Sequence, residues 1–272
     1  MALKLMYITN DVNIAKIAED SGVDWVFIDL EINGKEKRQG HLDTVISHHN
    51  IDDVKKIKEV LTKSELLVRV NPIYEGSKEE IDRVINDGAD IVMLPYFVDK
   101  DEVESFVDYV NERAKVCLLL ETPEAVGNID SILTVQGIDY IHIGLNDLHL
   151  GYKMKFMFEL LADGTVEMLC KRIKEKDVPY GFGEIAQLGK GTLPAENILA
   201  EHYRLGSSMA ILSRSFCNVN EIENIHEIKT LFDTGVNDIR NYENQLINES
   251  IDFFQLNSDF VFNKVNEIVK GL

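Results

Sequence analysis

Two acidic side chains take matching positions in this sequence, each close behind an apolar run. Glu121 directly follows the run at 116–120, and Asp147 comes four residues after the run at 140–143. Neighbouring parallel strands lie about 4.8 Å apart, so carboxylates at adjacent strand ends repel each other unless a cation joins them. Ligation by oxygen alone favours Mg²⁺ first and Mn²⁺ next, and two protein ligands leave positions open for substrate and water. The alternative is that each acid caps the helix that follows it.

An arginine interrupts a third apolar run. Arg69 lies within Leu-Leu-Val-Arg-Val at 66–70. A guanidinium in such a run costs several kcal/mol unless a negative charge meets it. A substrate carboxylate held by two parallel hydrogen bonds would supply that charge. An ion pair with Asp29 or Glu31, on the preceding run, would supply it equally well, and the sequence leaves both possibilities open.

Histidine is the side chain best suited to general acid–base catalysis near neutral pH. His41 lies in a polar segment after the run at 25–30, and it is the histidine that we expect to act as the base. Glu31 and a metal-bound water are its competitors. His142 lies inside an apolar run and is expected to belong to the core. No apolar run ends in lysine, which disfavours Schiff-base chemistry.

These candidate residues depend on a regular alternation of apolar runs and amphipathic segments. Several of the runs are apolar throughout, as in strands that are buried on both faces. Eight strands alternating with helices predict a (β/α)8 TIM barrel, in which catalytic groups gather at the carboxyl ends of the strands. A doubly wound open sheet is the alternative, but the first run lacks the glycine-rich turn of that fold. The predicted strands are 3–8, 25–30, 66–70, 91–95, 116–120, 140–143, 180–185 and 209–212, and the predicted helices are 12–20, 51–61, 78–86, 100–112, 123–133 and 156–176.

Composition narrows the class of protein further. The 272 residues are 45% hydrophobic, and 28 Lys+Arg against 47 Asp+Glu give a net charge of -19. Such a charge repels nucleic acids and anionic membranes. The sequence has neither a run of roughly 20 apolar residues nor a signal-peptide pattern, and its three cysteines are far apart. We therefore expect a cytoplasmic protein with reduced thiols and no membrane or nucleic-acid partner.

The chain changes character after residue 218. Residues 219–272 have only helical patterns, and Val261, Val265, Ile268 and Leu272 form an apolar stripe at helical spacing. We predict a barrel domain at 1–218 and C-terminal helices at 219–272. The last helix either covers its own barrel or packs on a neighbouring subunit, because the preceding helices already complete the outer ring.

Five short segments carry a family resemblance by their order: VFIDLE at 26–31, VRVN at 68–71, GADIVMLP at 88–95, ETPEAV at 121–126 and IGLNDL at 143–148. Over roughly residues 20–215 the chain resembles the HpcH/HpaI aldolase and citrate lyase β-subunit superfamily. Members are pyruvate-binding TIM barrels that make or break carbon–carbon bonds with Mg²⁺ or Mn²⁺. They are commonly oligomers with exchanged C-terminal helices, which favours the second arrangement of the last helix.

The resemblance implies roles for particular residues. Glu121 and Asp147 would bind the metal, and Arg69 would bind the substrate carboxylate and carbonyl oxygen. The backbone around Gly144 and Asn146 would lie against the same ligand. The implied reaction is that of a metal-dependent class II aldolase, which cleaves or forms a 4-hydroxy-2-keto acid through a pyruvate enolate. The alternatives are a citrate lyase-like or malyl-thioester lyase and a barrel that only binds a keto acid.

Two departures from the family pattern concern the base. The sugar-acid aldolases have a histidine after the glutamate of the second strand, where this chain has Ile32, and their partner aspartate falls on Asn86. The segment at 34–44 resembles the citrate lyase-like branch instead. The base is therefore left to His41, Glu31 or a metal-bound water.

Overall fold

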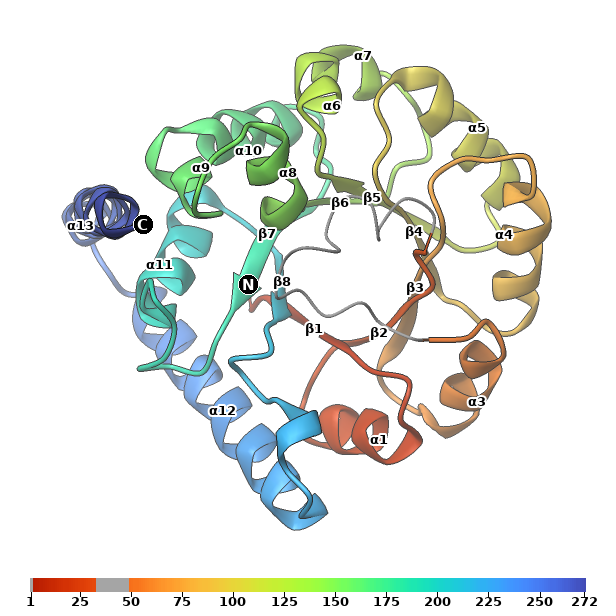
Figure 1. Ribbon diagram of the computed structural model, residues 1–272, viewed down its shortest axis with the longest axis horizontal. Coiled ribbons are helices and arrows are strands. Elements are labelled where there is room, and N and C mark those ends of the chain that lie inside the picture. Colours follow the sequence, from red (N-terminus) through yellow and green to blue (C-terminus); the bar gives the residue numbers. More distant parts are fainter. Residues whose placement is uncertain (1, 33–48) are drawn as a thin grey trace.

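Eight parallel strands close into a barrel in chain order, and helices surround it (Figure 1). The structure is a computed structural model that describes residues 2–32 and 49–272. The ring closes because β1 pairs with both β2 and β8. The predicted TIM barrel is thus confirmed, and each predicted strand is present within two residues of its expected ends. The strands are β1 (Lys4–Ile8), β2 (Trp25–Asp29), β3 (Glu65–Arg69), β4 (Ile91–Leu94), β5 (Lys115–Leu120), β6 (Tyr140–Ile143), β7 (Tyr180–Ile185) and β8 (Met209–Leu212).

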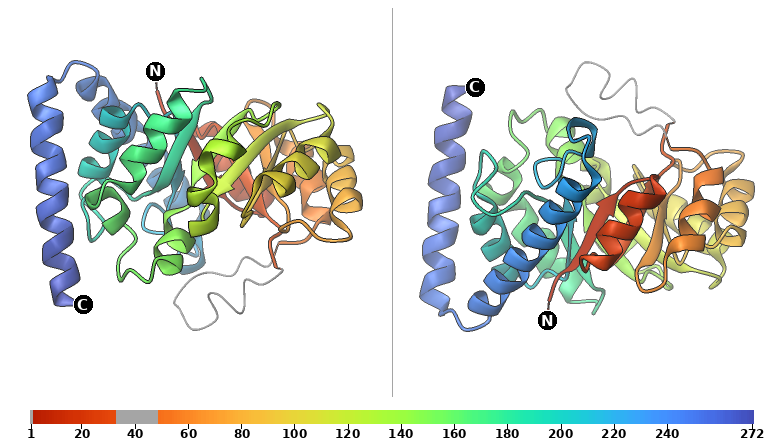
Figure 2. Two further views of the ribbon diagram at one scale, coloured as in Figure 1. Left: turned by 90° about the horizontal axis from the view of Figure 1, so that it is seen from above. Right: turned by 90° about the horizontal axis from the view of Figure 1, so that it is seen from below.

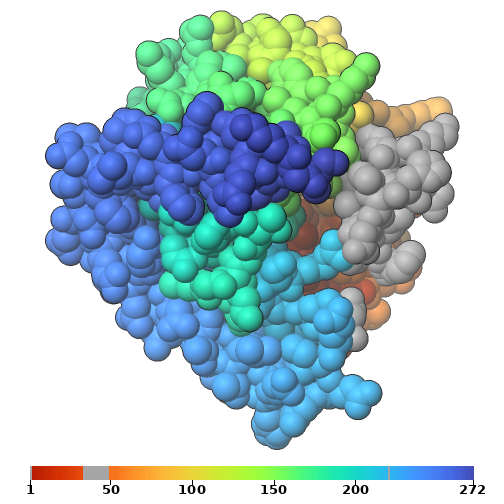
Figure 3. All heavy atoms as spheres, turned by 60° about the vertical axis from the view of Figure 1, so that its left-hand side comes forward, coloured from red at the N-terminus to blue at the C-terminus, as the bar shows by residue number. Residues whose placement is uncertain are grey.

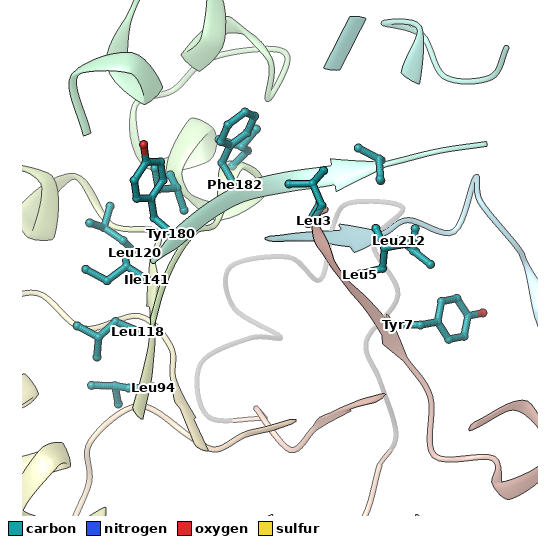
Figure 4. Close-up of a cluster of buried hydrophobic side chains, with 14 of the residues drawn as sticks. Leu3, Leu5, Tyr7, Leu94, Leu118, Leu120, Ile141, Tyr180, Phe182 and Leu212 are labelled. Carbon is teal, nitrogen blue, oxygen red and sulfur yellow. The ribbon is translucent and has the colours of Figure 1, made fainter. Parts of the chain in front are cut away.

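Strand side chains alternate between the barrel interior and the layer beneath the helices, because successive residues of a strand face opposite ways. Figure 4 shows Leu118, Leu120, Tyr180 and Phe182 pointing outward from the barrel, into the larger core cluster. The residues between them point inward. The interior is filled by Met6, Trp25, Phe27, Leu67, Ile91, Met93, Cys117, Leu119 and Met209.

Polar side chains cap the N-termini of several outer helices. Asp99 and Thr122 accept hydrogen bonds from the amides of Glu102 and Ala125 respectively, so each is an N-cap. The outer helices are α1 (Val12–Asp20), α3 (Asp52–Val60), α4 (Ser77–Asn86), α5 (Lys100–Val110), α6 (Pro123–Gly127), α7 (Ile129–Ile132), α8 (Leu145–Gly151), α9 (Glu159–Ala162), α10 (Thr165–Lys174) and α11 (Ala195–Leu205).

The helices differ from the predicted ones at several places. The helix expected at 123–133 is interrupted at Asn128, whose ψ of 8° is not helical. The helix expected at 156–176 is interrupted at Gly164, where φ is +86° and the backbone leaves the right-handed helix. A further helix, α8, occupies residues expected to form a loop, and it contains Asp147.

The C-terminal residues form a short 3-10 turn (Val219–Glu221) and two long helices, α12 (Ile225–Leu246) and α13 (Ile251–Gly271). Figure 1 shows α12 lying between α11 and α1, so it completes the outer ring. Helix α13 lies outside the ring against α9 and α11, alongside the barrel (Figures 2 and 3). None of the helices within the described residues is both long and apolar enough to cross a membrane.

A buried polar contact fixes α13 on α11. The Asn257 side chain donates to Glu201 Oε1 at 2.8 Å and accepts from Asn197 Nδ2 at 2.7 Å, and Arg204 pairs with Glu201 at 2.7 Å. Val261 and Val265 are buried beside it. Helix α13 therefore covers its own barrel, the first of the two expected arrangements. The domain boundary at residue 218 and the contact with a neighbouring subunit stay predictions.

Candidate active site

Arg69 ends β3 at the carboxyl face of the barrel and forms a double hydrogen bond with Asp29. Asp29 is its register partner on β2, and the bonds Nε–Oδ1 and Nη2–Oδ2 measure 2.8 and 2.9 Å. Its Nη1 lies 3.5 Å from Oε2 of the fully buried Glu31. Burial alone would lower the pKa of Arg69, but the negative charges of Asp29, Glu31 and Glu121 outweigh it and raise the pKa. The ion pair, one of the two possibilities that the sequence left open, is present.

Glu121 follows β5 and is also buried. Its Oε1 accepts a hydrogen bond of 3.1 Å from the amide of Tyr96. Tyr96 has a φ of +52°, which residues other than glycine rarely adopt. Backbone strain of this kind clusters at functional sites.

Gly144 allows the turn after β6 to pack closely against Glu121. A Cβ atom at Gly144 would lie 2.8 Å from Glu121 Oε2 and 2.9 Å from Glu121 Cβ. Both distances are shorter than the contacts that Cβ atoms make in proteins. The amide of Gly144 donates to the carbonyl of Leu120 at 2.9 Å, which holds the turn after β6 against the end of β5. Any side chain at position 144 would therefore displace Glu121 from its position against this turn.

Asp147 lies in the first turn of α8 and is buried, and the partly buried Asn146 precedes it. Neither acid is an N-cap, because Thr122 begins α6 and Gly144 begins α8. The capping alternative is therefore wrong for both. Glu121 and Asp147 thus offer oxygen donors just after the carboxyl ends of the neighbouring strands β5 and β6.

This donor set fits a hard divalent cation. Within the described part of the chain no group of three or more His, Cys, Asp or Glu side chains could hold a metal ion. Two carboxylates suit an ion that keeps several positions for water or substrate oxygens, as Mg²⁺ does.

Two further histidines lie near the carboxyl face of the barrel. His41, the predicted base, lies outside the described residues. His49 is partly buried, and its Nδ1 accepts a 3.0 Å hydrogen bond from the Asp29 amide. His149 lies within α8, and its Nδ1 lies 3.2 Å from the carbonyl of Leu145. The contact of His49 was not evident from sequence, because its partner lies 20 residues away.

His142 is buried as expected. Burial lowers its pKa to about 4, so it is neutral near pH 7. Its Nε2 lies 3.2 Å from the carbonyl of Gly183 on β7, and its Nδ1 has no hydrogen-bond partner among the described residues.

The departure at Ile32 is visible in the structure. The Ile32 side chain is 63% exposed, while its amide donates to Asn71 Oδ1 at 3.0 Å. Asn71 in turn donates to Glu80 at 2.8 Å. The amide of Ile32 therefore supports the structure beside Glu31, but its side chain offers no polar group there.

The comparisons with known proteins agree with this geometry. Residues 5–161 match the family model described as HpcH/HpaI aldolase/citrate lyase. A 2-keto-3-deoxy-L-rhamnonate aldolase of Shigella dysenteriae is 27% identical over 207 residues, which are 64% of this chain and 71% of the relative. Another protein of that name, from Escherichia coli O17:K52:H18, is 27% identical over 51% of this chain and 58% of its own length.

Solved structures share the fold. An HpcH/HpaI aldolase of Desulfitobacterium hafniense superposes with a TM-score of 0.63 at 17% identity, covering 88% of this chain and 93% of that one. An HpcH/HpaI aldolase/citrate lyase family protein of Burkholderia cenocepacia gives 0.62 at 15% identity, covering 84% and 95%. More than half of the chain matches the family model. The chain therefore belongs to the HpcH/HpaI aldolase/citrate lyase family of carbon–carbon lyases.

Proposed function

We propose that this protein is a divalent-metal-dependent class II aldolase, which cleaves or forms a 4-hydroxy-2-keto acid through a pyruvate enolate. The observation that carries the proposal is the pair of buried carboxylates, Glu121 and Asp147, at adjacent strand ends, with the partly buried Arg69 on the same face. The relatives named 2-keto-3-deoxy-L-rhamnonate aldolases support a small keto-acid substrate.

In this proposal each side chain has a defined task. Glu121 and Asp147 hold Mg²⁺ or Mn²⁺, which when bound supplies a Lewis acid for the 2-keto oxygen. Arg69 binds the substrate carboxylate and the enolate oxygen, while Asp29 fixes the plane of its guanidinium. The backbone around Gly144 and Asn146, with Asp147, borders the same ligand.

The bond that breaks joins C3 and C4 of the substrate. A base takes the proton of the C4 hydroxyl, C4 becomes the carbonyl carbon of the aldehyde, and the electron pair passes to C3 as the enolate forms. Protonation of C3 then gives pyruvate. Because the enolate oxygen gains negative charge as the bond breaks, Arg69 stabilises the transition state more than the substrate.

The activity is tested with the purified protein, Mn²⁺ and a series of 4-hydroxy-2-keto acids, by measuring pyruvate release. A second measurement follows exchange of the pyruvate methyl protons with deuterium, because this requires the enolate but no aldehyde. We expect both signals. A metal-loaded protein that releases no pyruvate and exchanges no protons would contradict the proposal.

His41 is proposed as the base. His41→Asn is expected to lower cleavage about 100-fold, since general-base catalysis contributes at least that factor. Decarboxylation of oxaloacetate should continue, because no hydroxyl proton has to be removed. Comparing the two rates in one preparation checks this, with the exposed His226→Asn as the matched control. Cleavage at the wild-type rate in the His41 variant would assign the proton transfer to another group.

We further propose a homo-oligomer that forms through α13. Leu256 and Phe260, one turn apart on that helix, are 69% and 44% exposed, although Val261 beside them is buried. Replacing both with serine is expected to reduce the mass measured by light scattering without changing the pyruvate exchange of the barrel. Ile225→Ser, at an exposed position that begins α12, is the control. A monomeric wild-type protein would contradict the proposal.

A cytoplasmic location completes the proposal. Cys117, Cys170 and Cys217 are all buried free thiols. Burial raises the pKa of Cys170 to about 12 and that of Cys217 to about 11, so both stay protonated and unreactive near neutral pH. Reduced thiols of this kind are typical of proteins in a reducing compartment.

A further inference from the structure

Strand β7 contains an irregularity that changes the direction of one carboxyl group. Gly181 pairs with Met209 of β8, and Glu184 pairs with Ile211, so three steps on β7 correspond to two on β8. This is a β-bulge with one extra residue, a device that redirects side chains near active sites. Phe182 points outward and stacks on His202 of α11, at 3.9 Å between ring centroids.

Because of the bulge, the Glu184 side chain points into the barrel. In a regular strand Glu184 would point to the same side as Phe182, because it lies two positions further along. Its register partner Ile211 packs against the interior cluster, and paired residues of parallel strands share a face. Glu184 therefore points inward near the carboxyl end of β7, on the face that bears Arg69 and Glu121.

Two neighbours hold the bulge in place. Gly183 has a φ of +57°, which favours glycine, and a Cβ atom there would lie 2.7 Å from the terminal Cδ1 of Leu145. The Gly183 carbonyl lies 3.2 Å from Nε2 of the buried His142. A carbonyl can only accept a hydrogen bond, so His142 carries its proton on Nε2 and supports the altered backbone. Leu145 begins α8, so the bulge lies beside the turn that carries Asn146 and Asp147.

Ser213 supplies a second inward polar group at the same place. Its amide donates to the carbonyl of Ile185 at 2.9 Å, which continues the pairing of β7 with β8. Leu212 belongs to the outer core cluster, so Ser213, the next residue, points inward as Ile211 does. Ser213 Oγ is buried without a hydrogen-bond partner among the described residues. A buried hydroxyl in this condition costs free energy unless another molecule binds it.

Within the part of the chain that the structure describes, no hydrogen bond or ion pair joins Glu184 to another residue. Burial raises its pKa, although the positive charges of Arg214 and Arg69 oppose this. These two charges disfavour a cationic ligand. A hydroxyl suits the position, because it can donate to a carboxylate and accept from a carboxylic acid.

We propose that Glu184 and Ser213 form the subsite that binds a hydroxyl group on the aldehyde half of the substrate. The inference rests on the proposed aldolase function and extends it to the substrate class, a hydroxylated aldehyde. Glu184 and Ser213 are specificity-determining residues in this account, and the proton transfer at C4 does not depend on them.

The test is aldol addition of pyruvate to glycolaldehyde or propanal, two aldehydes of similar size of which only the first has a hydroxyl. The measured quantity is the ratio of kcat/KM for the two. Glu184→Leu is expected to lower this ratio about 10- to 100-fold, and Ser213→Ala about 3- to 10-fold, since each removes one hydrogen-bonding group. Glu184→Gln keeps a donor and an acceptor, so its ratio should lie between that of Glu184→Leu and that of the wild type. The exposed Glu175→Gln is the control.

Deuterium exchange of the pyruvate methyl group distinguishes the two levels of the proposal. Exchange at the wild-type rate in the variants, with a lowered aldehyde ratio, supports the subsite. Normal exchange with an unchanged ratio in both Glu184→Leu and Ser213→Ala would overturn it and leave the aldolase function intact. Absence of exchange in the wild-type protein would overturn the aldolase function itself. If Glu184→Leu fails to fold, Glu184→Gln and Ser213→Ala still provide the ratio.

Discussion

Glu121→Ala and Asp147→Ala should each lower kcat/KM for pyruvate release by about 1,000-fold or more. The bound metal is proposed to stabilise the charge of the enolate oxygen, which is worth several kcal/mol, and each 1.36 kcal/mol is about tenfold in rate. Removing either carboxylate takes away one of two protein ligands. Chelation with EDTA should have the same effect on the wild-type protein, and Mg²⁺ or Mn²⁺ should restore the rate.

The loss should be one of metal binding and not of folding. Buried carboxylates at adjacent strand ends repel each other without a cation, and loss of this repulsion offsets the lost contacts, so thermal unfolding should change little. Titration with Mn²⁺ measures the binding directly. Glu124→Ala is a matched control, because Glu124 is exposed in the first turn of α6, three residues from Glu121. Full activity after thorough chelation would eliminate the metal site.

Arg69→Lys should lower kcat/KM by about 2–4 kcal/mol in transition-state free energy, or about 30- to 1,000-fold. Lysine keeps the positive charge but cannot form the two parallel bonds to Asp29 while presenting a third nitrogen to a ligand. The position of the charge is therefore lost even though its sign is kept. Steady-state kinetics with a 4-hydroxy-2-keto acid, together with pyruvate methyl exchange, measure the effect.

Stability measurements separate the binding role from the structural one. Arg69→Met should lower the free energy of unfolding by about 3–5 kcal/mol, because the buried Asp29 and Glu31 lose their counter-charge. Arg69→Lys should preserve most of that stability. Arg113→Lys, at a surface pair with Asp82, is the control for both measurements. Wild-type kinetics in Arg69→Lys would reduce Arg69 to a structural ion pair.

The fold and several of the candidate positions were predictable from local patterns. Each strand is a short apolar run buried on both faces, so eight such runs alternating with helices were sufficient to predict the barrel. The carboxyl ends of parallel strands meet at one face, which is why Glu121, Asp147 and Arg69 could be selected before any distance was known. Their roles stay predictions, since the geometry alone does not measure binding.

Other features could not be predicted from local patterns. Helix α8 was missed because its N-cap is Gly144, which gives no polar cap signal. The role of His49 depends on the Asp29 amide, and the position of α13 on a polar network with α11. None of these partners is adjacent in sequence, so periodicity could not reveal them.

The sequence by itself thus determined the order of strands, the face that bears the candidate site and the acids and arginine placed there, because each follows from local periodicity and the closure of parallel strands. Only the tertiary structure decided which way Glu184 points. Alternation along β7 puts it outside with Phe182, and the bulge at Gly183, supported by His142 and Leu145, turns it inside. A strand's facing is set by its pairing register, and a one-residue bulge reverses it in a way that no local pattern records.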